Sequence, residues 1–223
     1  MPKTSPFSEN YNNSIIGILG GTFNPPHLGH LRLAEEVACV HGLSRVIFIP
    51  SLLPPHKGSR EMAPSSHRLE MTRKACADNS LLEVSDLELR MDGPSYTVNT
   101  LRMLQGHDVK IHFIMGTDSL REISLWKDYD ELFSLSNFIV VKRPGVDFRA
   151  AWTEVPEAVR KKFRQDGETL VHEEFTTILP SPVEGLNISS TRIRNLLKEG
   201  RSIRYLVPEE VRSYIVEHQL YGK

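Results

Sequence analysis

Short, uninterrupted apolar runs alternate with segments of helical spacing along this chain, and this alternation most restricts its fold. Residues 15–19 and 46–50 are runs typical of strands buried on both faces, with helically spaced apolar residues between them. Similar segments follow in turn, with strands expected at residues 82–89, 109–115 and 138–141 and helices at residues 66–77 and 97–104. Residues 118–135 are expected to form one or two helices. The pattern predicts an α/β fold, a Rossmann-like doubly wound parallel sheet with right-handed crossovers.

The remaining segments complete this organisation. Residues 1–13 are rich in Pro, Ser and Asn, which predicts a flexible N-terminal tail, and residues 14–223 are expected to form a single domain. Residues 146–175 carry many charges and one expected helix at 156–163, so we interpret them as a variable connection rather than a second domain. Two C-terminal helices are expected, one opening near Ser190 and one beginning at Pro208. Ser65 or Ser66 is the expected N-cap of the helix at 66–77.

Composition argues against several classes of partner. The net charge of −1 and pI near 6.8 leave no basic excess, so we expect no nucleic-acid partner. No apolar stretch approaches the ~20 residues that span a bilayer, and the first residues lack the order of a signal peptide. We therefore expect a cytoplasmic protein with no membrane partner, and the sequence leaves open whether it forms a homo-oligomer. Cys39 and Cys76 are expected to be small buried hydrophobes.

Candidate functional residues are most concentrated in the loop after the first strand. Gly20 and Gly21 remove side chains where a ligand could approach backbone N–H groups, and two prolines stiffen the residues that follow. His27 and His30 then lie one helical turn apart beside a helix N-terminus, where free N–H groups and the helix dipole favour anions. This combination predicts a phosphate site.

Two other uses of this loop are disfavoured. The glycines do not form the Gly-x-Gly-x-x-Gly fingerprint, and the second strand has no acidic residue at its end, so an oxidoreductase is not expected. A structural zinc site needs about four ligands, and no third or fourth ligand accompanies the His-x-x-His pair. We expect no protein-held metal.

Polar residues follow several other strands, at the edge where ligands of such sheets bind. Lys57 lies after two prolines in the loop behind the second strand, and Gly116 and Asp118 follow the strand at 109–115. Asp118 could accept hydrogen bonds from ribose hydroxyls or cap a helix. Trp126, beside Lys127, offers a flat surface for a ring, although a tryptophan at this spacing is more often part of a core.

Hydroxyl residues open two of the expected helices. Ser95, Tyr96 and Thr97 surround one helix start, where a cap needs only one hydroxyl. Ser189, Ser190 and Thr191 open another, with Arg192 and Arg194 close behind. Hydroxyls at such positions are ordinarily caps, but with guanidinium groups nearby they also suit a triphosphate.

The stretch Gly20-Gly21-Thr22-Phe23-Asn24-Pro25-Pro26-His27-Leu28-Gly29-His30 resembles the signature of the nucleotidyltransferase superfamily, in the form found in bacterial nicotinate mononucleotide adenylyltransferases. The run from Ile188 to Arg194 resembles the second half of the same ATP site. The resemblance implies that residues 14–223 are one nucleotidyltransferase domain. It also implies transfer of AMP from ATP to nicotinate mononucleotide, giving nicotinate adenine dinucleotide and pyrophosphate in NAD biosynthesis.

The resemblance also assigns residues to roles. Those expected to act in catalysis are His27, His30, Lys57 and Arg194. Those expected to bind ATP are Gly20, Gly21, Thr22, Phe23, His27, His30, Gly116, Asp118, Arg143, Ile188, Ser189, Ser190 and Arg194. Those expected to bind nicotinate mononucleotide are Asn24, Lys57, Tyr96, Thr97, Trp126 and Lys127.

The reaction implied needs no protein nucleophile, because the attacking phosphate is already an anion and catalysis depends on positioning and charge stabilisation. Mg²⁺ is expected, held mainly by ATP and water.

Three alternatives remain open. The acceptor of the adenylyl group could instead be nicotinamide mononucleotide or phosphopantetheine, with the same ATP site. A class I aminoacyl-tRNA synthetase shares a His-x-Gly-His element, but this chain lacks room for a tRNA-binding domain and a basic excess. A nucleotide-binding sensor would have the same fold but would not catalyse a reaction.

Overall fold

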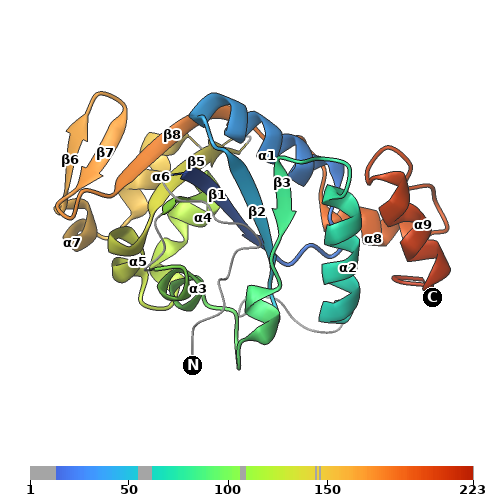
Figure 1. Cartoon of the computed structure of the whole chain (residues 1–223). Helices are drawn as coiled ribbons and strands as arrows, with labels where there is room; N and C mark the ends of the chain where they lie inside the picture. The colour runs from blue at the N-terminus through green and yellow to red at the C-terminus, as the bar shows by residue number, and fades with distance from the viewer. Residues whose placement is uncertain (1–13, 55–61, 106–108, 144, 146, 223) are drawn as a thin grey trace.

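Within the residues that the computed structural model describes, 14–54, 62–105, 109–143, 145 and 147–222, eight strands form one sheet in the order β3-β2-β1-β4-β5-β8-β7-β6 (Figure 1). The strands are β1 (Ser14–Gly21), β2 (Arg45–Pro50), β3 (Leu82–Val84), β4 (Val109–Gly116), β5 (Asn137–Lys142), β6 (Phe163–Asp166), β7 (Thr169–His172) and β8 (Thr177–Glu184). The six strands from β3 to β8 in this order pair in parallel, whereas β7 pairs antiparallel with both β8 and β6.

The strand order reverses beside β1. From β1 the chain proceeds outward through β2 to β3, then returns to place β4 on the other side of β1 and continues to β5. Gly17 lies between Val46 of β2 and His112 of β4 in register. The carboxyl ends of β1 and β4 therefore form the topological switch point, where ligands of such sheets bind.

Helices cover both faces of the sheet (Figure 1). One face packs against α1 (Leu28–His41), which contributes Leu33, Ala34 and Val37 to a core with Leu19 and Phe48. The other face packs against α3 (Thr97–Met103), α4 (Thr117–Arg121), the 3-10 turn η3 (Ile123–Leu125), α5 (Tyr129–Leu135) and α6 (Phe148–Glu154). The Rossmann-like prediction is confirmed, with the addition of an antiparallel edge.

A third core lies away from the sheet centre, where α2 (Ser65–Cys76), α8 (Ser190–Lys198) and α9 (Glu209–Glu217) pack together. Met71 of α2 is fully buried there against residues of both C-terminal helices. In Figure 1 this group lies at one end of the molecule and the β6–β7 hairpin at the other. These helices therefore pack on one another, in a core separate from the two that flank the sheet.

Several local predictions were wrong. The strand expected over residues 82–89 ends at Val84 and is followed by the 3-10 turn η2 (Leu87–Arg90), where Leu87 and Glu88 are buried. Neither Ser65 nor Ser66 caps α2, because both lie within the helix and Pro64 is its N-cap residue. The helix expected over residues 156–163 is the short α7 (Glu157–Arg160), and Phe163 already begins β6.

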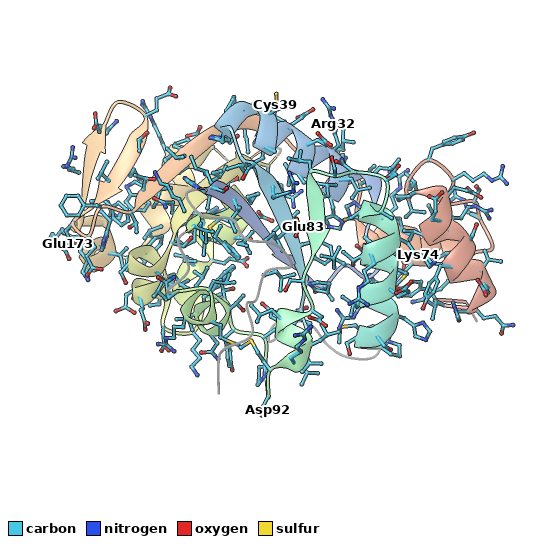
Figure 2. All side chains as sticks on the ribbon, in the orientation of Figure 1. Arg32, Cys39, Lys74, Glu83, Asp92 and Glu173 are labelled. Carbon is cyan, nitrogen blue, oxygen red and sulfur yellow. The ribbon has the colours of Figure 1, made fainter. Side chains whose placement is uncertain are left out.

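The surface mixes both signs of charge. Of the charged residues labelled in Figure 2, Arg32, Lys74 and Glu83 belong to α1, α2 and β3. Asp92 and Glu173 lie in connections between elements. Cys76 is buried as expected, but Cys39 is exposed on α1, so the prediction that it is buried was wrong. Among the described residues, no helix combines the length and apolarity needed to cross a membrane.

Candidate active site

The turn after β1 is packed tightly by an aromatic ring. Phe23 has a φ of 46° and only 3% of it is exposed. Its ring meets Phe48 at 5.3 Å between centroids and the edge of His30 at 5.1 Å. A Cβ on Gly21 would come within 3.0 Å of this ring, so Gly21 makes room for it. The Phe23 side chain thus supports His30.

His27 and His30 stack on each other at the start of α1. Their ring centroids are 3.6 Å apart at an interplanar angle of 15°. The backbone N–H of His27 donates to Nδ1 of His30 at 3.2 Å, which requires that a neutral His30 carry its proton on Nε2. A Cβ on Gly29 would lie 3.0 Å from Nδ1 of His27 and 3.5 Å from Cβ of Ile188. The spacing His-x-Gly-His therefore has a steric basis in this turn.

Burial controls the charge of His27. Only 5% of the residue is exposed, and this desolvation, with a smaller contribution from the Arg143 guanidinium, lowers its pKa to about 4. His27 is therefore a neutral imidazole near pH 7 in the unliganded protein. A neutral imidazole offers one N–H donor, and an anion bound beside it would favour the protonated form.

The ends of β4 and β5 meet beside this pair. Gly116 ends β4, and Thr117 Oγ1 accepts a hydrogen bond from the backbone N–H of Arg143 at 3.2 Å. Nε of Arg143 lies 3.8 Å from Oδ1 of Asp118. A Cβ at Gly116 would collide with Oδ1 of Asp118 and come within 3.2 Å of the Arg143 side chain. The structure thus brings together three residues predicted for ATP, Gly116, Asp118 and Arg143.

Residues of α8 reach the same loop from the C-terminal side. Ser189 is the N-cap of α8, and its side chain accepts from the N–H of Arg192 at 3.2 Å. Ser190 Oγ donates to the carbonyl of Pro25 at 2.8 Å, and Nη1 of Arg194 donates to the carbonyl of Asn24 at 3.0 Å. The two sequence stretches that resemble halves of an ATP site are therefore in direct contact. Ser190 and Arg194 were predicted to bind phosphate. In this structure each of them donates a hydrogen bond to a backbone carbonyl of the β1 loop, a contact that was not predicted.

Four of the residues predicted for the pyridine mononucleotide, Tyr96, Thr97, Trp126 and Lys127, lie at the start of α3 or between η3 and α5. Nζ of Lys127 lies 4.8 Å from the centroid of the Tyr96 ring, and Thr97 is the first residue of α3. Trp126 is partly buried and meets the ring of Phe113 edge-on at 6.4 Å. The one or two helices expected over residues 118–135 are the two helices α4 and α5. Trp126 was expected on a helix but lies between these two, directly after the turn η3.

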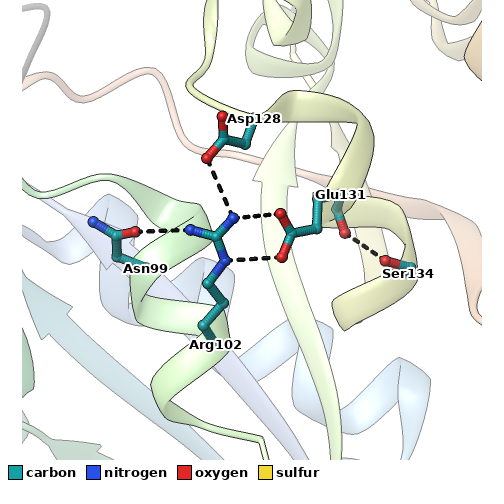
Figure 3. Close-up of polar contacts among 5 residues, drawn as sticks. All are labelled: Asn99, Arg102, Asp128, Glu131 and Ser134. Atoms are coloured by element: carbon teal, nitrogen blue, oxygen red, sulfur yellow. Dashed lines mark hydrogen bonds and ion pairs between the residues drawn. The ribbon is translucent and has the colours of Figure 1, made fainter.

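A charged network fixes the turn that carries Trp126 and Lys127 (Figure 3). Arg102 of α3 binds both carboxylate oxygens of Glu131 and donates to Asp128 at 3.3 Å. Asp128 has a φ of 48° and precedes α5, and a hydrogen bond within α5 joins Ser134 to the carbonyl of Glu131 at 2.9 Å. Arg102 therefore holds the start of α5 against α3 directly after Lys127.

The structure also shows contacts that sequence reasoning missed. The Asn24 carboxamide oxygen is buried and accepts from the N–H of Ala63 at 3.0 Å and from Tyr221 OH at 2.8 Å. Arg68 lies beneath the same loop, fully buried. The partners of Asn24 are 39 and 197 residues away in sequence, so no local pattern indicated them. Lys57, predicted to bind phosphate, lies outside the described residues.

A cavity of about 750 Å³ lies beyond Thr117, between α6 and the β6–β7 hairpin. Its lining includes Lys142, Arg149 and Trp152 but neither His27 nor His30. The segment interpreted as a variable connection thus forms a wall near the end of β4. In the part of the chain that the structure describes, no group of three or more His, Cys, Asp or Glu side chains could hold a metal ion.

A doubly wound sheet with a histidine pair at its switch point defines a nucleotide-binding α/β protein. The chain belongs to the cytidylyltransferase-like family, whose model matches residues 18–196.

Relatives within this family are similar over nearly their whole length. A protein of Geobacter sp. strain M21, named a probable nicotinate-nucleotide adenylyltransferase, is 44% identical over 210 residues, which cover 92% of this chain and 97% of the relative. A protein of Desulfitobacterium hafniense with the same name is 44% identical over 211 residues, covering 92% of this chain and 95% of the relative.

Solved structures show the same fold. The nicotinic acid mononucleotide adenylyltransferase of Plasmodium falciparum, complexed with NaAD, superposes with a TM-score of 0.69 at 18% identity. The match covers 93% of this chain and 97% of that chain.

Proposed function

We propose that this protein is a nicotinate-nucleotide adenylyltransferase, which transfers AMP from ATP to nicotinate mononucleotide in NAD biosynthesis. The observation that carries the proposal is the stacked His27–His30 pair at the switch point, in a chain 44% identical to relatives of that name. The proposal treats residues 14–223 as one nucleotidyltransferase domain and includes a cytoplasmic location.

The proposed reaction is an in-line displacement at the α-phosphorus of ATP. An oxygen of the mononucleotide 5′-phosphate forms a bond to this phosphorus, and the bond to the oxygen that bridges toward the β-phosphorus breaks. Nicotinate adenine dinucleotide forms and pyrophosphate leaves. His27 and His30 donate hydrogen bonds to phosphate oxygens whose charge grows in the transition state. Buried donors are fixed in advance and need no reorganisation, which is why the packing of Phe23 and Gly29 matters.

The proposal gives the other site residues the roles that the family resemblance implies. Asp118 would accept from ribose hydroxyls, and Arg143, Ser189 and Ile188 would border the adenosine. Arg194, Ser190 and Lys57 would hold the leaving pyrophosphate. Tyr96, Thr97, Trp126 and Lys127 would receive the nicotinate ring and its carboxylate.

Mg²⁺ is part of the proposal as a substrate-held ion. The described residues offer no carboxylate cluster for it, and Asp118 is 3.8 Å from Arg143, so phosphate oxygens and water would supply its ligands. When bound, Mg²⁺ neutralises phosphate charge. The protein's own contribution is orientation and hydrogen bonding.

Pyrophosphate release tests the proposal when Mg-ATP is supplied with one acceptor at a time. We expect rapid release with nicotinate mononucleotide and much slower release with nicotinamide mononucleotide or phosphopantetheine. Preference for another acceptor would overturn the proposed ring pocket but keep the ATP site. No release with any acceptor would favour a nucleotide sensor.

A further inference from the structure

Arg68 is a fully buried cation whose guanidinium binds three backbone carbonyls, one in the β1 loop and one at each end of the connection between β2 and α2. It lies on the first turn of α2 and has no exposed surface. Its Nη1 donates to the carbonyl of Thr22 at 2.8 Å, its Nη2 to that of Leu52 at 3.1 Å and its Nε to that of Ala63 at 3.0 Å. Thr22 follows β1, Leu52 follows β2 and Ala63 precedes α2. One planar guanidinium therefore joins the loop after β1 to both ends of the connection between β2 and α2.

Few residues could replace this side chain. Burial opposes the charged form and lowers the pKa of Arg68, while Tyr221 and the buried carboxylate of Glu88 oppose that effect. A buried charge is costly unless its donors are satisfied, and here each of three nitrogens has a carbonyl partner. The fork of a guanidinium can reach three carbonyls at fixed angles, whereas an ammonium is a single point of donation.

The segment that Arg68 holds is the one that presents the histidines. Thr22 precedes Phe23, whose ring contacts His30. A second set of contacts fixes the other side of this turn, because the Asn24 carboxamide oxygen accepts from Ala63 N–H and from Tyr221 OH. Ala63 thus connects the two sets, since its carbonyl binds Arg68 and its N–H binds Asn24.

We infer that Arg68 is a positioning residue for adenylyl transfer, assisted by Tyr221: together they fix the Thr22–Asn24 turn and thereby the placement of His27 and His30. The inference rests on the proposed function. Neither residue touches the reacting atoms in this account, so both act through the histidine loop. A displacement of about 1 Å in catalytic groups lowers rates by about a hundredfold, which sets the scale of the effect.

The test compares Arg68→Lys with a destabilised control on the same helix, Met71→Ala. Met71 is fully buried in the core of α2, α8 and α9 and makes none of the loop contacts described here. Both variants are assayed with ATP and nicotinate mononucleotide, well below their Tm values. We expect Arg68→Lys to lower kcat about 10- to 100-fold with each KM within about threefold of wild type. Met71→Ala should lower Tm and leave kcat within about twofold of wild type.

Tyr221→Phe removes one hydroxyl donor and provides a milder variant, which decides the matter if Arg68→Lys does not fold. We expect it to lower kcat about three- to tenfold at unchanged KM. Wild-type kcat in either Arg68→Lys or Tyr221→Phe would overturn the inference, as would equal losses of kcat in Arg68→Lys and Met71→Ala. The proposed function fails separately, through wild-type protein that releases no pyrophosphate.

Discussion

At the scale of single residues, the site depends on what surrounds each functional group. His27 is neutral because it is buried, and its ring lies against the backbone because residue 29 is a glycine. The same burial makes His27 a fixed donor, which a solvated histidine would not be.

His27→Ala tests this role. Removal of one preorganised donor to a developing phosphate charge should raise the barrier by about 3 kcal/mol and lower kcat about a hundredfold. Steady-state pyrophosphate release measures the effect, with circular dichroism to confirm the fold. Unchanged turnover in a folded variant would remove His27 from the mechanism.

Gly116→Ala tests the ATP side of the switch point. The added methyl would collide with Asp118 and crowd Arg143, so both side chains must move. We expect KM for ATP to rise about tenfold or more, with a smaller change in KM for the mononucleotide. Ser119→Ala, which adds no atoms to α4, is the matched control. Equal KM values for ATP in wild type and Gly116→Ala would contradict the placement of ATP here.

The sequence allowed prediction of those site residues whose neighbours are close in sequence. His27, Gly29 and His30 form one turn of chain, and Ser189 caps the helix that it opens. Arg68 and Tyr221 could not be found in this way, because Arg68 reaches Thr22 and Leu52 across 46 and 16 residues and Tyr221 reaches Asn24 across 197. Nothing in the sequence indicates which backbone carbonyl a side chain will bind.

At the scale of elements, α8 couples the C-terminal helices to the histidine loop. Ser189→Ala should cost about 1 kcal/mol of unfolding free energy because the cap to Arg192 N–H is lost. Ser189→Gly should cost only a few tenths of that, since glycine is a tolerated N-cap. Denaturant unfolding measures the free energy of unfolding of both variants. Equal losses in Ser189→Ala and Ser189→Gly would show that the hydroxyl does not stabilise the helix by capping.

The buried parallel strands were predictable because each is an apolar run followed by a helical pattern. The antiparallel edge formed by β6 and β7 was not predictable in this way. Three of the four residues of β6 are exposed and polar, and β8 contains Pro180 and Pro182. These prolines fit because β7 pairs only with Thr177 and Ile178, so further along β8 has a partner on one side alone.

At the scale of the whole molecule, buried histidines link stability to pH. Burial lowers the pKa of both His27 and His112 to about 4, whereas an unfolded histidine titrates near 6.5. Between these values the unfolded chain binds more protons, so the free energy of unfolding falls as pH drops from 6.5 toward 4.

Each of these histidines contributes up to about 1.4 kcal/mol per pH unit in that window. His112→Gln should remove the contribution of His112 and make the pH dependence shallower. Denaturant unfolding of wild type and variant at intervals from pH 7 to pH 4 measures the slopes. Parallel slopes would contradict a buried, neutral His112.

The central claim is that the chain cleaves ATP between the α- and β-phosphates and transfers the adenylyl group to nicotinate mononucleotide. The most direct measurement supplies the protein with the mononucleotide, Mg²⁺ and ATP labelled at either the α- or the γ-phosphate, and follows the label by chromatography. The account predicts that the α-label appears in nicotinate adenine dinucleotide and the γ-label in pyrophosphate. An α-label that stays in adenosine nucleotides, or a γ-label that enters the pyridine product, would contradict it.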